Sequence, residues 1–363
     1  MAKASNNATW MKTRIRDNNQ DPYIYELKLP GTHHSSISRK TLHTSNAIDS
    51  NFKKYEKFSF LISPILKSWT ACQHLSVHDQ LEAGVRAFDV RVSFTQGNFH
   101  TSHSFMGPLL SNVLDGFVRF YKQHGTSEVI ILRISKDSEN ESTMAGKEEE
   151  FNKLLSNHPI HQYFYAGGDP MQRLSTYDST PIVLILDDGL KTSTGPGFDN
   201  PFYNKWYNTN TDVNLAVRIS QNLNNNMYNP ANSSQNISAI QLILTPREDD
   251  IVKGILTVVF IALMCLGLKG TIAFLVTSMF LKSRVILFNS LALVSFSLLV
   301  GVGTYMLVMG RSPFSIFDMS RKISKEFFSY SKNGQYNIVS VDFVDREFCD
   351  TIISRNGRRE ENV

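Results

Sequence analysis

Three short apolar runs constrain the fold of this chain most. They read VIILRIS from Val129, PIVLIL from Pro181 and AIQLIL from Ala239. A continuous apolar run of this length is typical of a parallel strand that is buried on both faces. Between these runs, residues 108–124 carry apolar side chains at helical spacing, and residues 144–155 suggest another helix. Strands that alternate with helices predict an α/β fold with a parallel sheet.

Composition narrows the class of protein. A chain of 363 residues can bury a core, as one large domain or two ordinary ones. The formal net charge of +4 comes from scattered basic residues, which argues against a nucleic-acid-binding protein and leaves room for an anionic substrate. The cysteines Cys72, Cys265 and Cys349 lie far apart, so neither a disulfide framework nor a zinc site is expected.

The remaining predicted elements are shorter and more polar. Residues 1–20 are expected to be disordered, and the irregular residues 38–70 are interpreted as an insertion or a lid. Tyr23–Leu29 is β-prone and is expected to end at the Pro30–Gly31 turn. A short helix is predicted over residues 77–85. Further strands are predicted at Val85–Phe94, Asn98–His103 and Tyr336–Phe343.

The composition changes sharply before the last predicted strand. One charge, Lys269, occurs from Gly254 to Leu281, and none occurs from Val285 to Met309. The 25 residues of the second segment would span about 37 Å as a helix, more than the bilayer core of about 30 Å. A buried helical hairpin is the alternative, but globular helices rarely run so long without a polar face. The sequence therefore predicts a transmembrane hairpin.

This hairpin would fix the topology of the whole chain. Strands on both sides of the insertion must join one sheet, so the chain has to cross the membrane an even number of times. Two crossings predict a multi-pass membrane protein whose folded part lies on one side. The N-terminal residues contain no apolar signal segment, so the folded part is expected in the cytosol.

One motif places histidines directly after a strand. LKLPGTHHSS, from Leu27, contains His33 and His34 beside the Pro-Gly turn. Because α/β barrels build their sites at the C-terminal ends of strands, His33 is a candidate acid–base residue. A histidine in a loop is more often a surface residue, so the motif gains weight only with partners.

Candidate partners occur on the next two strands. Asp89 and Arg91 are two residues apart and therefore point to the same face of their strand. In an isolated antiparallel sheet this would be a solvated polar face. Inside a barrel, a carboxylate and a guanidinium would be buried, and charged groups are rarely buried unless they are paired or take part in function. The following strand carries His100 and His103.

Several spaced motifs together resemble a known family. PGTHHSS, LEAGVRAFDVRV, HTSHSFMGPL, SEVIILRIS, LILTP and NIVSVDFV occur in the order seen in the X domain of phosphatidylinositol-specific phospholipase C. The resemblance is to the bacterial-like branch with a single X domain, and it runs from Tyr23 to Phe343 apart from the apolar insertion and some loops. It implies a TIM-like (β/α) barrel, here interrupted before its last strand by the transmembrane hairpin.

The expected organisation combines this barrel with the insertion. The sequence predicts a disordered terminus at residues 1–20 and the first part of the barrel at 21–250. The transmembrane insertion follows at 251–310, the last part of the barrel at 311–356 and a charged tail at 357–363.

The resemblance also implies a role for each candidate residue. His33 matches the base that takes a proton from the inositol 2-hydroxyl, and His103 matches the acid that protonates the leaving diacylglycerol. Arg91 offers a charged donor fork to the phosphoryl oxygens. Asp342 matches the carboxylate that holds the base in the correct tautomer, and Asp89 would help to fix Arg91 or the site.

Metal use and substrate contacts are also expected from the resemblance. The calcium-dependent branch has a carboxylate where this chain has Arg91, so cleavage without metal or other cofactor is predicted. Where the bacterial pattern has an aspartate after its base, this chain has His34, which cannot stabilise an imidazolium as a carboxylate would. Lys136, Arg133 and Trp206 are further candidates for substrate contact; for Trp206, ordinary packing is the alternative.

Two functions of different classes remain open. The first is a membrane-anchored phosphodiesterase that cleaves phosphoinositide lipids to diacylglycerol and an inositol cyclic phosphate. The second is a catalytically weak or inactive barrel that binds phosphoinositide or a partner at the membrane. A glycerophosphodiester hydrolase fits less well, because those barrels use a carboxylate-bound metal that these residues do not assemble.

Overall fold

The computed structural model describes residues 7–48, 53, 56–137, 144–187, 190, 197–199, 202–205, 214–215, 218, 237–243 and 336–356. The strands are β1 (Leu29–Thr32), β2 (His43–Ala47), β3 (Ala87–Thr95), β4 (Asn98–His103), β5 (Phe105–Leu109), β6 (Ile130–Lys136), β7 (Ile182–Leu186), β8 (Phe198–Asp199), β9 (Phe202–Lys205), β10 (Ile237–Leu242) and β11 (Ile338–Val341). The α-helices are α1 (Trp10–Arg14), α3 (Ser59–Thr70), α4 (Val77–Ala83), α5 (Leu110–His124), α7 (Glu148–Asn157) and α12 (Arg346–Ile353). Short 3-10 helices are η1 (Asn7–Thr9), η2 (Arg16–Asn18), η3 (Ile24–Glu26), η4 (Glu56–Phe58), η6 (Pro159–Tyr163) and η7 (Leu174–Tyr177).

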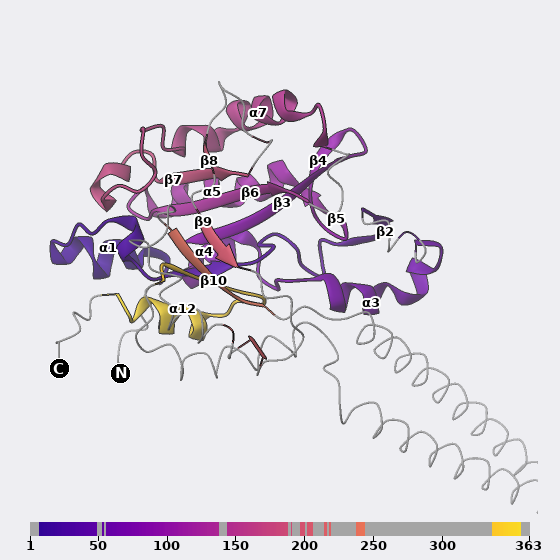
Figure 1. Ribbon diagram of the computed structural model, residues 1–363, viewed down its shortest axis with the longest axis horizontal. Helices are drawn as coiled ribbons and strands as arrows, with labels where there is room; N and C mark the ends of the chain where they lie inside the picture. Colours follow the sequence, from indigo (N-terminus) through magenta and orange to yellow (C-terminus); the bar gives the residue numbers. More distant parts are fainter. Residues whose placement is uncertain are drawn as a thin grey trace, which may run out of the picture.

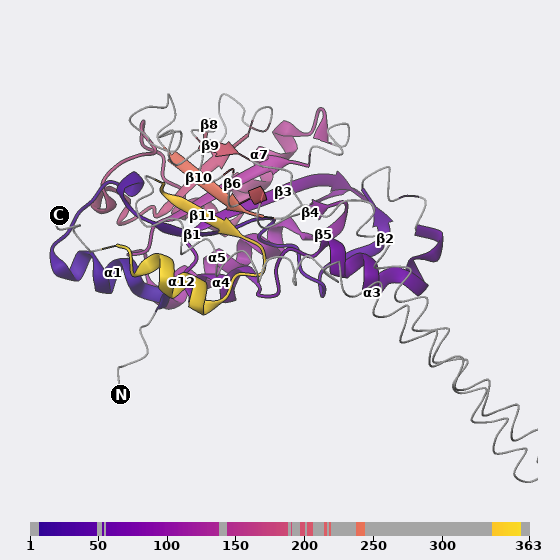
Figure 2. The same ribbon diagram turned by 60° about the horizontal axis from the view of Figure 1, so that its bottom comes forward.

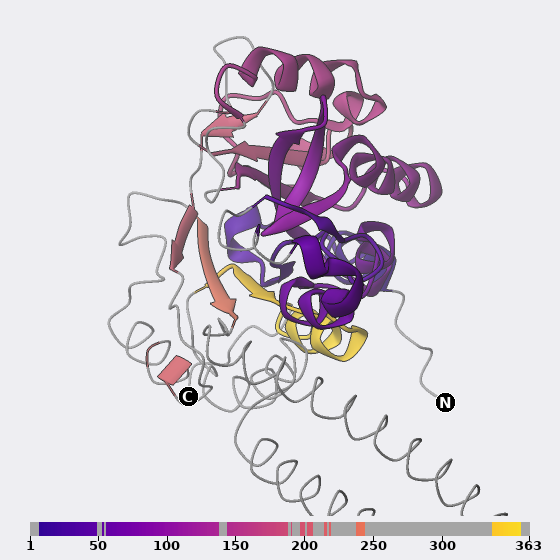
Figure 3. The same ribbon diagram turned by 90° about the vertical axis from the view of Figure 1, so that its right-hand side faces the viewer.

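Eight of the described strands run parallel. Their spatial order is β8-β7-β6-β3-β1-β11-β10-β9. The long strand β3 extends beyond β1, and its second half pairs with β4 in antiparallel fashion. Strands β5 and β2 continue this antiparallel extension. Figure 3 shows the sheet curving, and in Figure 1 α7 lies at the top of the view and α12 at the bottom.

The prediction of a TIM-like barrel with a transmembrane hairpin is contradicted in its first part. The sheet is mixed, and within the described residues it forms a half-barrel that is open between β8 and β9. Strand β8 has only two residues and β9 only four, which leaves little backbone for closing hydrogen bonds. The antiparallel part arises at Gln96 and Gly97, whose positive φ angles of 51° and 75° turn β3 tightly into β4.

The transmembrane part of that prediction is contradicted as well. Among the described residues, no helix combines the length and the apolar character needed to cross a bilayer. The segments expected to cross, within residues 251–310, lie outside the described part of the chain. The transmembrane hairpin and the multi-pass localisation, which rested on the hydropathy of the sequence alone, are therefore not supported by the structure.

The first strand differs from its prediction by several residues. The range expected as a strand contains η3, and β1 begins at Leu29 and includes the Pro30–Gly31 pair that was expected to end it. Gly31 belongs in the strand because a Cβ there would lie 2.7 Å from Ser340 Oγ and 2.8 Å from Ile338 Cγ2. Only glycine lets β1 approach β11 this closely.

Most other predicted elements are confirmed to within a few residues. The predicted strands correspond to β3, β4, β6, β7, β10 and β11, and the predicted helices to α4, α5 and α7. Residues 38–70, interpreted as an insertion or lid, contain β2, which pairs with β5, and helix α3. Helices α1, α4, α5 and α12 line one side of the sheet (Figure 2).

The N-terminal segment is built into the fold. Residues 7–20, expected to be disordered, form η1, α1 and η2, and Trp10 and Met11 are fully buried. The fully buried Arg86, just before β3, donates from Nη2 to the carbonyl of Ala8 at 2.6 Å and to Glu128 Oε2 at 2.7 Å. Glu128, just before β6, accepts from the backbone N–H of Met11 at 3.2 Å. A buried ion pair thus fastens the segment to the N-terminal ends of two parallel strands.

Candidate active site

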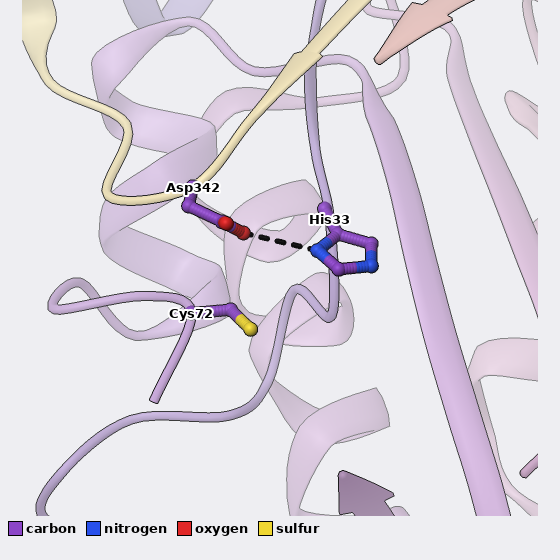
Figure 4. A group of neighbouring side chains, drawn as sticks. All are labelled: His33, Cys72 and Asp342. Atoms are coloured by element: carbon purple, nitrogen blue, oxygen red, sulfur yellow. Dashed lines mark hydrogen bonds and ion pairs between the residues drawn. The ribbon is translucent and has the colours of Figure 1, made fainter. Parts of the chain in front are cut away.

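The register of two parallel strands brings His33 and Asp342 together. Thr32 on β1 is level with Val341 on β11, so the residues that follow these strands meet at the same edge of the sheet. The Nδ1 atom of His33 lies 3.0 Å from Asp342 Oδ1, and both side chains are buried. Figure 4 shows the two side chains pointing toward each other. A carboxylate on Nδ1 holds the imidazole in the tautomer whose Nε2 is free to accept a proton.

A glutamine supports both ends of this pair. Gln73 Nε2 donates to the carbonyls of His33 at 2.9 Å and Val341 at 3.1 Å, and its Oε1 accepts from the N–H of Val344 at 3.2 Å. One buried amide therefore ties together the two loops that carry the base and its carboxylate.

His34 and His103 form a stacked pair beside His33. The ring centroids of His34 and His103 are 4.0 Å apart with an interplanar angle of 25°, and the His33 and His103 centroids are 6.2 Å apart. His34 has a φ of 40°, a left-handed conformation that turns its ring back over the site. His103, at the end of β4, has its Nδ1 2.7 Å from the carbonyl of Thr70. That carbonyl fixes the proton on Nδ1 and leaves Nε2 for a ligand.

The surroundings disfavour positive charge on the stacked pair. Burial, followed by the charge of His33 and Arg91, lowers the pKa of His103 to about 4, although the Thr70 carbonyl acts in the opposite direction. Burial and the neighbouring His103 and His33 hold the pKa of His34 well below its usual value. Both rings are therefore neutral near pH 7 in the free protein. The Nδ1 atom of His34 is buried and has no hydrogen-bond partner among the described residues.

Asp89 and Arg91 lie on β3 as predicted, but their partners differ from the expectation. Asp89 Oδ1 accepts from Arg133 Nη1 at 3.4 Å, and Arg133 also forms a two-armed ion pair with Asp187. Burial alone would raise the pKa of Asp89, but Arg133, Arg91 and His33 outweigh it and lower that pKa. No carboxylate in the described part of the chain forms an ion pair with Arg91. Its guanidinium is thus available to an anion.

The remaining predicted contacts are spread more widely. Lys136, at the end of β6, pairs with Glu148 Oε1 at 3.3 Å, and Arg133 is held by two carboxylates as described. Trp206 lies outside the described residues. A cavity of about 30 Å³ lined by His33, Asp89 and Arg133, among others, lies inside the half-barrel and has room for ordered water.

The structure places one further side chain at the site that sequence reasoning missed. Cys72 is fully buried, and its sulfur lies 3.4 Å from Nδ1 of His103. Burial, followed by the charge of Asp342, raises the pKa of this thiol well above its usual value. Cys72 and the supporting Gln73 follow helix α3 in a stretch with no strand or motif pattern, so no local signal in the sequence could have identified them.

Comparisons with curated proteins point to one family. No family model matches the sequence. A PI-PLC X-box domain-containing protein of Dictyostelium discoideum is 28% identical over 173 residues, which are 47% of this chain and 22% of that protein. The human PI-PLC X domain-containing protein 2 is 31% identical over 133 residues, 35% of this chain and 42% of that protein. A 1-phosphatidylinositol phosphodiesterase of Staphylococcus aureus is 25% identical over 183 residues, 49% of this chain and 51% of that protein. The chain thus spans at most about half the length of these relatives.

Solved structures share the fold. The phosphatidylinositol-specific phospholipase C of Listeria monocytogenes matches with a TM-score of 0.56 at 15% identity, covering 97% of this chain and 99% of that one. A Staphylococcus aureus phosphatidylinositol-specific phospholipase C matches with a TM-score of 0.57 at 14% identity, covering 97% and 98%. The fold is therefore that of these phospholipases. Together with the curated relatives, it confirms the predicted resemblance to the phosphatidylinositol-specific phospholipase C X-domain family.

Proposed function

We propose that this chain is a phosphodiesterase that cleaves phosphatidylinositol-type lipids to diacylglycerol and an inositol cyclic phosphate without a metal cofactor. The observation that carries the proposal is the 3.0 Å contact of His33 Nδ1 with Asp342 Oδ1, with His103 facing the same space. The names of the curated relatives support the choice of substrate class.

In the proposed reaction, the lipid's own hydroxyl is the nucleophile. Nε2 of His33 removes the proton of the inositol 2-hydroxyl as its oxygen attacks the adjacent phosphorus. The bond from phosphorus to the diacylglycerol oxygen breaks, and His103 gives that oxygen a proton. Arg91 donates hydrogen bonds to the phosphoryl oxygens, on which negative charge develops.

His103 must carry a proton to act as the acid in this scheme. Its pKa of about 4 describes the protein without an anion in the site. A phosphodiester places a negative charge beside the ring and favours the imidazolium, so binding of substrate raises the pKa of His103. Binding of the substrate would thus favour the protonated form of His103 that acts as the acid.

One observation favours a second candidate function. The neutral ring of His34 stacks at 4.0 Å on His103, where a carboxylate would stabilise the protonated acid. A half-barrel in which His103 is seldom protonated could bind phosphoinositide at a membrane surface and turn it over slowly or not at all.

Phosphorus NMR of the products separates these functions. The full chain is incubated with phosphatidylinositol vesicles in excess chelator. A cyclic phosphodiester signal from the wild type that is absent with His103→Ala supports the proposal. Vesicle binding by folded protein with no new phosphorus signal supports the second candidate, and a signal that requires added calcium overturns the metal-independent mechanism.

A further inference from the structure

Cys72 belongs to the one cluster of metal-ligating side chains in the described part of the chain. A ligand atom of His33, the Cys72 sulfur and a carboxylate oxygen of Asp342 all lie within 4.8 Å of one another. Figure 4 shows the sulfur turned toward the space beside the His33–Asp342 contact. We propose that His33, Cys72 and Asp342 bind one Zn²⁺ ion, which blocks the base and inhibits the enzyme. The inhibition rests on the function proposed above; the metal site does not.

The three ligands are already close to the geometry that zinc requires. With Zn–N and Zn–O distances of about 2.0 Å and Zn–S of about 2.3 Å, tetrahedral ligand atoms are separated by roughly 3.3–3.6 Å. His33 Nδ1 and Asp342 Oδ1 are 3.0 Å apart, so a metal has to widen that contact slightly and draw the sulfur inward by about 1 Å.

The backbone under the cluster is held in place. The carbonyl of Cys72 accepts from the N–H of Phe343 at 2.7 Å, directly beside Asp342 in the chain. The N–H of Cys72 donates to the carbonyl of Ile37 at 3.1 Å, in the loop that follows His33. Each ligand therefore sits on a segment that is hydrogen-bonded to another segment of the site. A frame of this kind keeps a first coordination shell assembled.

The chemistry of the donors selects the metal. One nitrogen, one sulfur and one carboxylate oxygen suit Zn²⁺, whereas Ca²⁺ and Mg²⁺ take oxygen ligands. Three protein ligands leave a fourth position for water, as in other open zinc sites. The thiol releases its proton to solvent on binding, and no oxidant or reductant is involved.

Zinc and the proposed reaction compete for His33. A neutral imidazole has one nitrogen lone pair for either a proton or a metal. Once zinc occupies it, the ring cannot take the proton of the inositol hydroxyl, and Asp342 no longer holds the required tautomer. The wide spacing of the cysteines argued against a zinc site, but the proposed site uses only one cysteine. The β1–β11 register brings His33 and Asp342 together, and the backbone hydrogen bonds of Cys72 to Ile37 and Phe343 place the sulfur beside them.

Binding is tested first without reference to activity. The full chain is titrated with Co²⁺ as a spectroscopic substitute for Zn²⁺, and the thiolate-to-cobalt absorption band is recorded. The wild type should show one equivalent of bound metal with this band. Cys72→Ala and Cys72→Ser should lose it, and the matched control Cys349→Ala, which removes a second buried cysteine on α12, should keep it. Urea unfolding of each variant confirms that it is folded; two variants at Cys72 are used so that one misfolded protein does not decide the result.

Inhibition is then measured as a ratio within each protein. Phosphodiesterase rates with Zn²⁺ are divided by the rate of the same protein in chelator, and the Cys72 variants should need at least about tenfold more zinc for half inhibition. A band that survives in both folded Cys72 variants, or an active wild type that binds no metal, overturns the zinc site. If the Cys72-dependent band appears in a chain that is inactive without zinc, the zinc site stands and the proposed catalytic function fails.

Discussion

Two buried polar clusters lie at opposite ends of the parallel strands and are built in different ways. At the N-terminal end, the guanidinium of Arg86 donates to the Glu128 carboxylate and to the carbonyls of Leu81, Val85 and Ala8. At the C-terminal end, Asp89 Oδ2 and His34 Nδ1 are buried without a hydrogen-bond partner in the described part of the chain. The guanidinium in the first cluster has hydrogen-bond partners within the protein, whereas the second cluster contains buried polar atoms without one.

The difference separates a structural from a functional use of buried charge. Nearly all buried polar atoms in folded proteins have partners, so the unpartnered Asp89 Oδ2 and His34 Nδ1 call for an explanation. A bound inositol phosphodiester would supply hydroxyl donors for the Asp89 oxygen and phosphoryl acceptors for a neighbouring N–H. Substitutions at the N-terminal end should therefore lower mainly the stability, and substitutions at the C-terminal end should lower mainly the turnover.

The largest effect is expected on breaking the N-terminal cluster. Arg86→Met leaves the Glu128 carboxylate buried without its partner, which should lower the free energy of unfolding by about 3–5 kcal/mol. The control is Arg133→Met at the site end, whose side chain is 19% exposed and whose loss should cost clearly less. Urea unfolding measures both variants. Equal midpoints for Arg86→Met and the wild type would show that the two clusters are not different in kind.

The matching change at the other end should affect turnover instead. Asp342→Asn replaces the carboxylate that fixes the His33 tautomer by a neutral amide that can also donate, so the rate in chelator should fall by about 10²–10⁴-fold with the unfolding midpoint little changed. Asp345→Asn is the control, because Asp345 only caps α12 through the N–H of Phe348 at 2.8 Å, and asparagine can cap as well. A control that loses as much activity as Asp342→Asn would contradict the assigned role.

The neutral histidines should make stability depend on pH. The folded-state pKa of His103, about 4, lies below its ordinary value of 6.5, so the unfolded chain binds more protons than the folded chain between these values. The free energy of unfolding should therefore fall as pH decreases from 6.5 to 4, by up to a few kcal/mol, and His103 should contribute nothing further below pH 4. In His103→Asn the slope over this window should be shallower. Parallel slopes for the two proteins would rule out a buried neutral His103.

A smaller effect, an increase in rate, is expected from placing a carboxylate beside the acid His103. His34→Asp places a carboxylate beside His103 and should raise the pKa of His103 by about one unit and the rate about tenfold. Aspartate tolerates the φ of 40° at this position, as does asparagine in the uncharged control His34→Asn. Rates are measured for the three proteins at one pH. If aspartate and asparagine give the same rate, charge at this position does not limit turnover.

The sequence revealed those parts of the fold that have a local cause. Strands β6 and β7 are buried on both faces and read as continuous apolar runs, so they were found to within one or two residues. Strand β1 was misplaced because Pro30 and Gly31 usually end strands; the close approach of Ser340 and Ile338, which requires glycine, is visible only in three dimensions.

The candidate site shows the same division. The histidines and Arg91 could be proposed from motifs, and Asp342 from the resemblance, but the contact between His33 and Asp342 depends on the register of two strands 309 residues apart. The pairing of Arg133 with Asp187 and the position of Cys72 depend on neighbouring strands and loops in the same way. None of these contacts has a periodic signature in the sequence.

The central claim is that His33 takes the proton of the attacking hydroxyl, and chemical rescue tests it most directly. In His33→Ala the cleavage rate in chelator should fall by about 10²–10⁴-fold, and added imidazole should restore part of it in proportion to the imidazole concentration. The unfolding curve of the variant should match that of the wild type, so that the loss is one of chemistry. A variant that cleaves at the wild-type rate, or a folded inactive variant that imidazole leaves inactive, would contradict the role of His33 as the base.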